Sequence, residues 1–152
     1  MATTWLSASE MRAWRNFIES VSTMTAALES DLVPFGLTMG DYEVLVRLSE
    51  SDTQRLRMCD LANSLQLSPS GLTRRLDGLV SSGLVERVAS PSDRRVMFAA
   101  LTPAGLAKLV EAAPDHVASV RNRFFRGLTK DQVCALGDIF ETVKGNLTAC
   151  PE

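Results

Sequence analysis

The feature of this sequence that most constrains its fold is a tight joint between two short helical patterns, at residues 67–69. Ser68 can cap a helix, and Pro69 suits the first helical position, where a missing N–H is tolerated. Apolar residues share one helical face before the joint and recur at helical spacing after it: Met58, Leu61, Ala62 and Leu65; Leu72, Leu76, Leu79 and Val80. The pattern predicts two short helices in close succession.

Two strand patterns follow the second helix. Residues 84–88 and 96–101 are short and rich in β-branched or bulky apolar side chains, and residues 89–95 between them carry the Ser, Pro and Asp typical of turns. We therefore expect a β-hairpin, with Arg94 and Arg95 at its tip or just inside the second strand. Helix, short turn, helix and hairpin form a winged helix-turn-helix, so the predicted fold is mainly α with a small β-hairpin wing.

Longer helices are predicted on both sides of this unit. Their starts carry a capping residue followed by an acid or Gln three positions later, or directly by proline: Ser7, Thr38, Thr102 and Thr129. The first helix is predicted to end just before Pro34, and Pro114 predicts a kink in the helix after Thr102. A chain of 152 residues, 45% of them apolar, is long enough to bury one core, so we expect a single domain.

The formal net charge of −2 hides a segregation of charge along the chain. Residues 1–54 hold three Arg or Lys against eight Asp or Glu, whereas residues 55–95 hold seven arginines against four acids. Residues 96–152 balance at six of each. Because the field near a surface follows the charges within about a Debye length, the basic segment predicts local contact with a polyanion.

Several functional classes find no support in the sequence. No apolar run is long enough to span a bilayer and no signal-peptide pattern opens the chain, so a cytoplasmic protein is expected. The cysteines, Cys59, Cys134 and Cys150, are odd in number and widely spaced, which favours neither a disulfide framework nor a zinc site. The single histidine has no HExxH partner and there is no phosphate-binding loop, so we expect no metal, no cofactor and no enzyme.

The second of the two short helices, after Ser68, has a distinctive exposed face. At 100° per residue, Arg74 points opposite the apolar stripe, with Ser70 and Gly78 beside it and Thr73 and Arg75 on the flanks. Small, polar and cationic groups can approach a grooved polyanion without bulky obstruction. This face is therefore the predicted contact surface.

Residues 58–105 resemble the MarR family of bacterial transcription regulators. The matching pieces are Leu61-Ala62, the run from Ser68 to Arg74, Gly83-Leu84-Val85, Arg87, Asp93-Arg94-Arg95, and Leu101-Thr102 with Gly105. The resemblance implies an obligate homodimer, with a recognition helix in each major groove of DNA and a wing beside each minor groove. It also implies a DNA-binding lobe at 38–101 and dimerisation helices at 1–35 and 102–150 within one domain, 1–152.

The function that the resemblance implies is sequence-specific regulation of transcription. We expect a repressor that binds a pseudo-palindromic operator in double-stranded DNA and is relieved by a small ligand. The predicted DNA-binding residues are Ser68, Ser70, Thr73, Arg74, Arg75, Asp93, Arg94 and Arg95.

These residues have different expected roles. Arg74 is the predicted base reader, while Arg75 meets the DNA backbone or packs at the helix flank. Asp93 is predicted to orient an arginine by a charge-assisted hydrogen bond. By family pattern Arg95 is the groove residue, with Arg94 as the alternative; in another interpretation the three residues only tie the hairpin together.

Many members of the family release DNA when a small, often aromatic or anionic ligand enters the cleft between the dimerisation helices and the DNA-binding lobe. The residues predicted to line such a cleft are Trp14, Phe17, Met39, Tyr42 and His116. Each has an alternative interpretation as ordinary core, because aromatic residues and Met at helical spacing usually pack.

Two other functions stay open at this point. Cys59 lies near a helix start and near Arg57, a setting that can lower a thiol pKa and would suit a redox-sensing regulator. A winged helix can also serve only for protein association. In that case the arginines of the exposed face would be dispensable for nucleic-acid binding.

Overall fold

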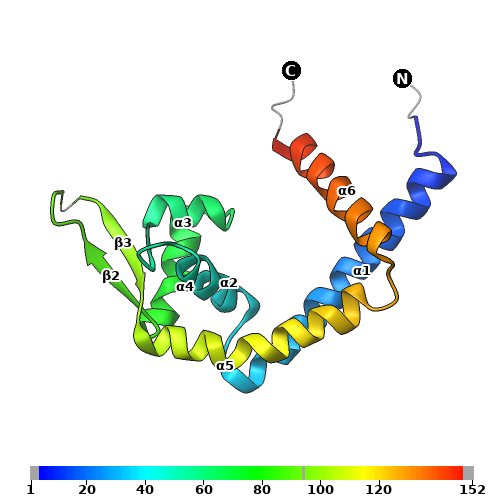
Figure 1. Ribbon diagram of the computed structural model, residues 1–152. Helices are drawn as coiled ribbons and strands as arrows, with labels where there is room; N and C mark the ends of the chain where they lie inside the picture. The colour runs from blue at the N-terminus through cyan, green and yellow to red at the C-terminus, as the bar shows by residue number, and fades with distance from the viewer. Residues whose placement is uncertain (1–3, 94, 149–152) are drawn as a thin grey trace.

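The structure is a computed structural model that describes residues 4–93 and 95–148; Arg94 and Cys150 lie outside the described residues. The helices are α1 (Ala8–Leu32), α2 (Met39–Ser49), α3 (Met58–Ser64), α4 (Pro69–Ser81), α5 (Pro103–Val120) and α6 (Lys130–Thr148). The strands are β1 (Arg55–Arg57), β2 (Val85–Ala89) and β3 (Met97–Leu101). Figure 1 shows a lobe of α2–α4 and the strands at one end, and α1 and α6 at the other, with α5 running between them.

The predicted helix starts are confirmed by their caps. Ser7 closes a capping box with Glu10, and Thr38 closes one with Asp41. The Ser68 hydroxyl accepts from the backbone N–H of Gly71, as expected for the cap of α4. Because each cap satisfies backbone donors that the first helical turn leaves free, these short-range contacts fix where the helices begin. The first helix ends at Leu32, and a 3-10 turn follows at Val33–Phe35.

The sheet has one strand more than the predicted hairpin. β2 and β3 pair antiparallel, with Val85 opposite Leu101, and β1 pairs with the other edge of β3, which gives the order β1-β3-β2. The hairpin prediction is confirmed. β1 is only three residues long, too short for its alternation of Arg and Leu to mark it as a strand.

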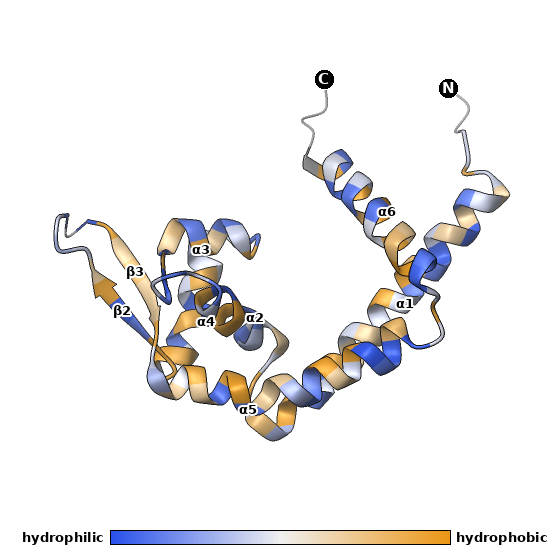
Figure 2. Cartoon of the chain, viewed as in Figure 1, coloured by the Kyte–Doolittle hydropathy of each residue, from blue (hydrophilic) through white to orange (hydrophobic). Residues whose placement is uncertain are grey.

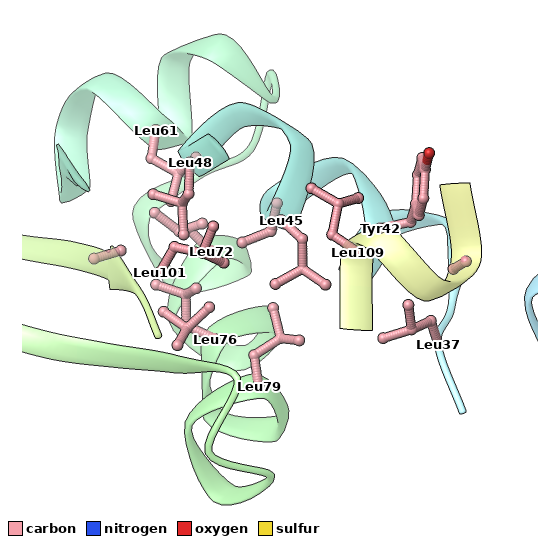
Figure 3. Packing of buried hydrophobic residues seen from close by; sticks show 14 of the residues in the cluster. Leu37, Tyr42, Leu45, Leu48, Leu61, Leu72, Leu76, Leu79, Leu101 and Leu109 are labelled. Carbon is pink, nitrogen blue, oxygen red and sulfur yellow. The ribbon is translucent and has the colours of Figure 1, made fainter. Parts of the chain in front are cut away.

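The core lies mainly in the lobe of α2–α4 and the strands. Fully buried leucines from α2, α3 and α4 interdigitate there, as Figure 3 shows: Leu45, Leu48, Leu61, Leu72 and Leu76. The stripe of α4 thus faces inward as predicted. Because a helix with one buried stripe must turn its opposite side to solvent, this packing sets which face of α4 is exposed.

α5 joins the lobe to the terminal helices. Near its start Leu109 is packed in the lobe core, and beyond it the helix continues past Pro114 to Val120. A π-helical turn follows at Arg121–Phe125. On α1, the carboxylate of Asp31 accepts hydrogen bonds from Ser119 Oγ and from Arg123 Nη2, so α1 and α5 are held together beyond the lobe.

α6 and the first part of α1 stay outside the core. Among the described side chains of α6, none is buried, and Figure 2 shows apolar segments along both helices. Large apolar residues are exposed on α1 and α6: Trp14, Phe17, Ile18 and Val21; Val133, Ile139, Phe140 and Val143. Within residues 4–93 and 95–148, no helix is long and apolar enough to cross a membrane.

Candidate DNA-binding site

Arg74 is the least restrained cation on the exposed face of α4. Its side chain is exposed and makes no hydrogen bond or ion pair with any described residue. Its neighbours are partly engaged: Thr73 Oγ1 donates to Pro69 O at 2.9 Å, and Ser68 Oγ lies 3.2 Å from Ser70 Oγ. The hydroxyls of Thr73 and Ser68 therefore hold their own helix, while the guanidinium of Arg74 faces solvent.

Arg75 lies at the flank of α4, against the start of α2. Its Nη1 donates to Thr38 Oγ1 at 3.1 Å, and its guanidinium occupies the space that a Cβ at Gly40 would need. The side chain is half-buried. Of the two roles that the sequence left open, the geometry corresponds to packing at the helix flank.

Arg87 ties the wing to α4, a contact that sequence reasoning missed. From β2, its Nη2 donates to the backbone oxygen of Thr73 at 3.0 Å and to Asp77 Oδ1 at 2.7 Å. The opposite charges of Asp77, on the exposed side of α4, and Arg87, on the following strand, were the signal in the sequence that could have predicted this contact. Since the pair is exposed, its role is to fix geometry more than to add stability.

The turn of the wing is organised by backbone contacts of Asp93. Asp93 Oδ1 accepts from the backbone N–H of Arg95 at 2.9 Å, and Asp93 O accepts from Val96 N–H at 2.9 Å. The predicted carboxylate–guanidinium pair is not formed with Arg95, because the short Asp side chain binds the backbone two residues on. The Arg95 side chain is exposed; Arg94, the alternative, lies outside the described residues.

A cleft of about 450 Å³ opens between the wing and the start of α3. Its lining includes three cations, Arg57, Arg87 and Arg95, so the hollow beside the wing is positively charged. Cys59 also lines it, with an exposed thiol that donates to Asp60 Oδ1 at 3.5 Å. The charged groups beside this thiol are therefore of both signs.

The predicted ligand-lining residues fall into two separate groups. Trp14 and Phe17 lie on the exposed part of α1, where Phe17 packs against Phe140 of α6 with ring centroids 5.9 Å apart. Met39 and Tyr42 line a cleft of about 390 Å³ between α2 and the end of α3. Trp14 and Phe17 do not line this cleft.

His116 belongs to the second group. Its ring centroid lies 4.4 Å from that of Tyr42, and its Nδ1 is buried with no hydrogen-bond partner in the described part of the chain. Burial lowers the pKa of His116, and the negative charge of Asp31 opposes this shift in part. Burial likewise raises the pKa of Tyr42.

An exposed cationic helix behind a tight turn, braced by a two-stranded wing with its own cations, defines a winged helix-turn-helix DNA-binding protein. Residues 37–97 match the model of the MarR family. Together with 43% identity to the MarR family regulator AbsC over 95% of the chain, this match shows that the chain belongs to the MarR family of transcriptional regulators, which are DNA-binding proteins and not enzymes.

Solved structures of the family are closely similar. AbsC, a MarR family transcriptional regulator from Streptomyces coelicolor, is 43% identical with a TM-score of 0.92, over 95% of this chain and 98% of AbsC. Sco3205, a MarR family regulator from the same organism, was solved in complex with DNA; it is 36% identical with a TM-score of 0.92, over 97% of this chain and 93% of Sco3205. The transcriptional repressor YetL of Bacillus subtilis is 27% identical over 90% of this chain and 83% of YetL.

Proposed function

We propose that this regulator is a repressor that binds a pseudo-palindromic operator as a homodimer. The observation that carries the proposal is the arrangement of α4 and the wing, which presents Arg74 and Arg95 to solvent on one lobe. The likeness to a repressor, YetL, and to a regulator solved with DNA, Sco3205, supports it. Such a regulator acts in the cytoplasm, where bacterial DNA lies.

Each side chain of the DNA-binding lobe then has a role. α4 enters the major groove, which is wide enough for a helix, and Arg74 reads a base edge there. Arg95 meets the minor groove, whose concentrated negative potential attracts guanidinium. Ser70 can donate its hydroxyl proton to a phosphate oxygen when Ser68 is the donor between the two serines, whereas Thr73 donates its proton to Pro69 O and keeps lone pairs that can accept from a base amino group. Asp93 holds the wing turn and acts through Arg95.

The terminal helices support a homodimer. An isolated helix gains little stability from its own hydrogen bonds, and α6 buries none of its described side chains within the chain. Apolar residues such as Phe17, Ile139 and Phe140 are exposed on neighbouring terminal helices, where a second copy would cover them. Two copies related by a two-fold axis present two α4 helices to DNA, which requires a pseudo-palindromic site.

The remaining alternatives stay predictions. Relief by a small aromatic or anionic ligand is compatible with the cleft at Met39 and Tyr42. Trp14 and Phe17 are better explained as part of the dimer surface. A thiol sensor at Cys59 and a winged helix used only for protein association are not favoured by a specific contact in the described chain.

Selection of duplexes from a random DNA pool by the purified protein tests the proposal. We expect an enriched sequence with two-fold symmetry and half-sites about one helical turn apart, bound by two chains per duplex. Affinity should fall steeply with salt, because phosphate contacts release counterions. No enriched sequence, or one chain per duplex in sedimentation analysis, would refute the proposed function.

A further inference from the structure

We propose that Arg75 is a positioning residue: it sets the angle of α4 by binding the start of α2, and it does not contact DNA. The inference rests on the proposed function, because it concerns how the recognition helix is held. Arg74 and Arg75 are adjacent in sequence, and only their surroundings distinguish them. Arg74 is exposed without a partner among the described residues, whereas Arg75 is half-buried and hydrogen-bonded.

The contact of Arg75 is specific in two ways. Its Nη1 donates to Thr38 Oγ1 at 3.1 Å, across 37 positions of sequence. Its guanidinium also lies directly over Gly40, where the missing side chain leaves room for it. A glycine in a helix costs stability relative to alanine. Glycine at position 40 is explained by the Arg75 guanidinium, which fills the space that an alanine side chain would need.

The site that receives Arg75 is itself well anchored. Thr38 Oγ1 donates to Asp41 Oδ2 at 2.6 Å and accepts from the backbone N–H of Asp41 at 3.1 Å, so the hydroxyl has a fixed orientation. The backbone N–H of Met39 donates to Glu29 Oε2 at 2.7 Å, which fixes the start of α2 to α1. α4 is thereby positioned against a rigid point that is itself bound to α1, one of the proposed dimerisation helices.

The other flank of α4 is held by Arg87, through the backbone oxygen of Thr73 and the carboxylate of Asp77. Guanidinium groups thus hold α4 from both sides, and Arg74 projects between them. Bidentate recognition of a base by Arg depends on its position and direction, so a tilt of the helix weakens the selected site more than a random one. Arg75 contributes to sequence preference without touching a base.

Two variants separate this role from a phosphate contact. Arg75→Met removes the guanidinium, whereas Gly40→Ala keeps the charge and displaces it from Thr38. The probes are the duplex selected by the wild type and a shuffled duplex of the same composition. For both variants we expect the affinity ratio of selected to shuffled duplex to fall about fivefold, the net value of one typical hydrogen bond, with the salt slope unchanged. Arg47→Met is the control: it removes an exposed cation of α2 that takes no part in the contact with Arg75. It should leave the ratio of selected to shuffled affinity unaltered.

A phosphate contact gives a different pattern. Arg75→Met would then weaken both duplexes alike and reduce the salt slope by about one, and Gly40→Ala would leave binding unchanged. Either result overturns the positioning role. Absence of any preference in the wild type refutes the proposed function itself, while a preference that both variants retain refutes only the inference about Arg75.

Unfolding measurements test the contact without DNA. In a double-mutant cycle, Arg75→Met should destabilise the wild type more than it destabilises Gly40→Ala, because the substituted alanine has already displaced the guanidinium. Additive effects of the two substitutions on the denaturation midpoint would overturn the contact and the inference with it.

Discussion

Gly105 offers a quantitative test of how closely α5 approaches the lobe. It is buried near the start of α5, where an added Cβ would collide with the backbone oxygen of Leu84 and crowd the side chain of Leu101. The oxygen of Leu84 cannot swing away easily, because it accepts from Thr102 N–H at 3.2 Å and from Thr102 Oγ1 at 3.1 Å. Gly105→Ala should therefore force a backbone shift.

The magnitude follows from two opposing effects. Overpacking that moves backbone costs up to about 3 kcal/mol, and replacing a helical glycine by alanine returns about 0.5–1 kcal/mol. The net expectation for Gly105→Ala is a loss of about 1–2 kcal/mol in the free energy of unfolding. Gly78→Ala is the matched control, since its added Cβ meets nothing within 4 Å and should stabilise α4 by about 0.5–1 kcal/mol.

The assay is urea unfolding followed by circular dichroism, with all proteins at one concentration because association contributes to stability. We expect the midpoint to fall for Gly105→Ala and to rise for Gly78→Ala, with similar slopes. If both midpoints move in the same direction, or if Gly105→Ala unfolds with the wild type, the close approach of α5 to Leu84 is not a constraint on the fold.

Three further predictions concern binding, assembly and pH. Arg74→Ala should weaken the selected duplex by about 1–3 kcal/mol and leave the unfolding midpoint unchanged; an equal loss on a shuffled duplex in an anisotropy titration would reject base reading. Phe140→Glu should yield monomers that no longer bind DNA, because a charge would be buried between copies; an intact dimer in sedimentation velocity would exclude this surface of α6 from the interface. Burial lowers the pKa of His116 in the folded protein below its ordinary value of 6.5. Between the folded and the unfolded pKa the unfolded chain therefore binds more protons than the folded protein. The free energy of unfolding should accordingly decrease as pH falls below about 6.5. His116→Gln should flatten that loss in urea titrations between pH 7 and 5; an unchanged pH dependence would contradict the assignment.

The parts of the fold that the sequence predicts correctly are local. Ser7, Thr38, Ser68 and Thr102 each cap the helix that starts one residue later, and their contacts reach only three residues along the chain. The apolar stripe of α4 is equally local, and it determines that the opposite face is exposed. The face of α4 that is exposed to solvent was therefore predictable.

The parts that escape prediction depend on distant segments. β1 forms because Arg55–Arg57 pair with the free edge of β3. No local sequence pattern predicts this pairing. Arg75 and Arg87 each find partners on another element, so their tie to Thr38 or to α4 required the tertiary arrangement. At Asp93 the contact found is with the backbone N–H of Arg95, which the prediction of an arginine side-chain partner did not include.

α5 mechanically couples the two proposed functions of the chain, DNA binding by the lobe and dimerisation by the terminal helices. Its 18 residues form one continuous helix with a contour of about 27 Å, with Leu109 fixed in the lobe and Ser119 fixed to α1. A tilt of about 10° at the far end would carry the lobe through about 5 Å, a sizeable part of the width of a DNA groove. Small rearrangements among the terminal helices are thereby amplified, so in the proposed homodimer a change in their packing would shift both α4 helices relative to the successive grooves of the duplex.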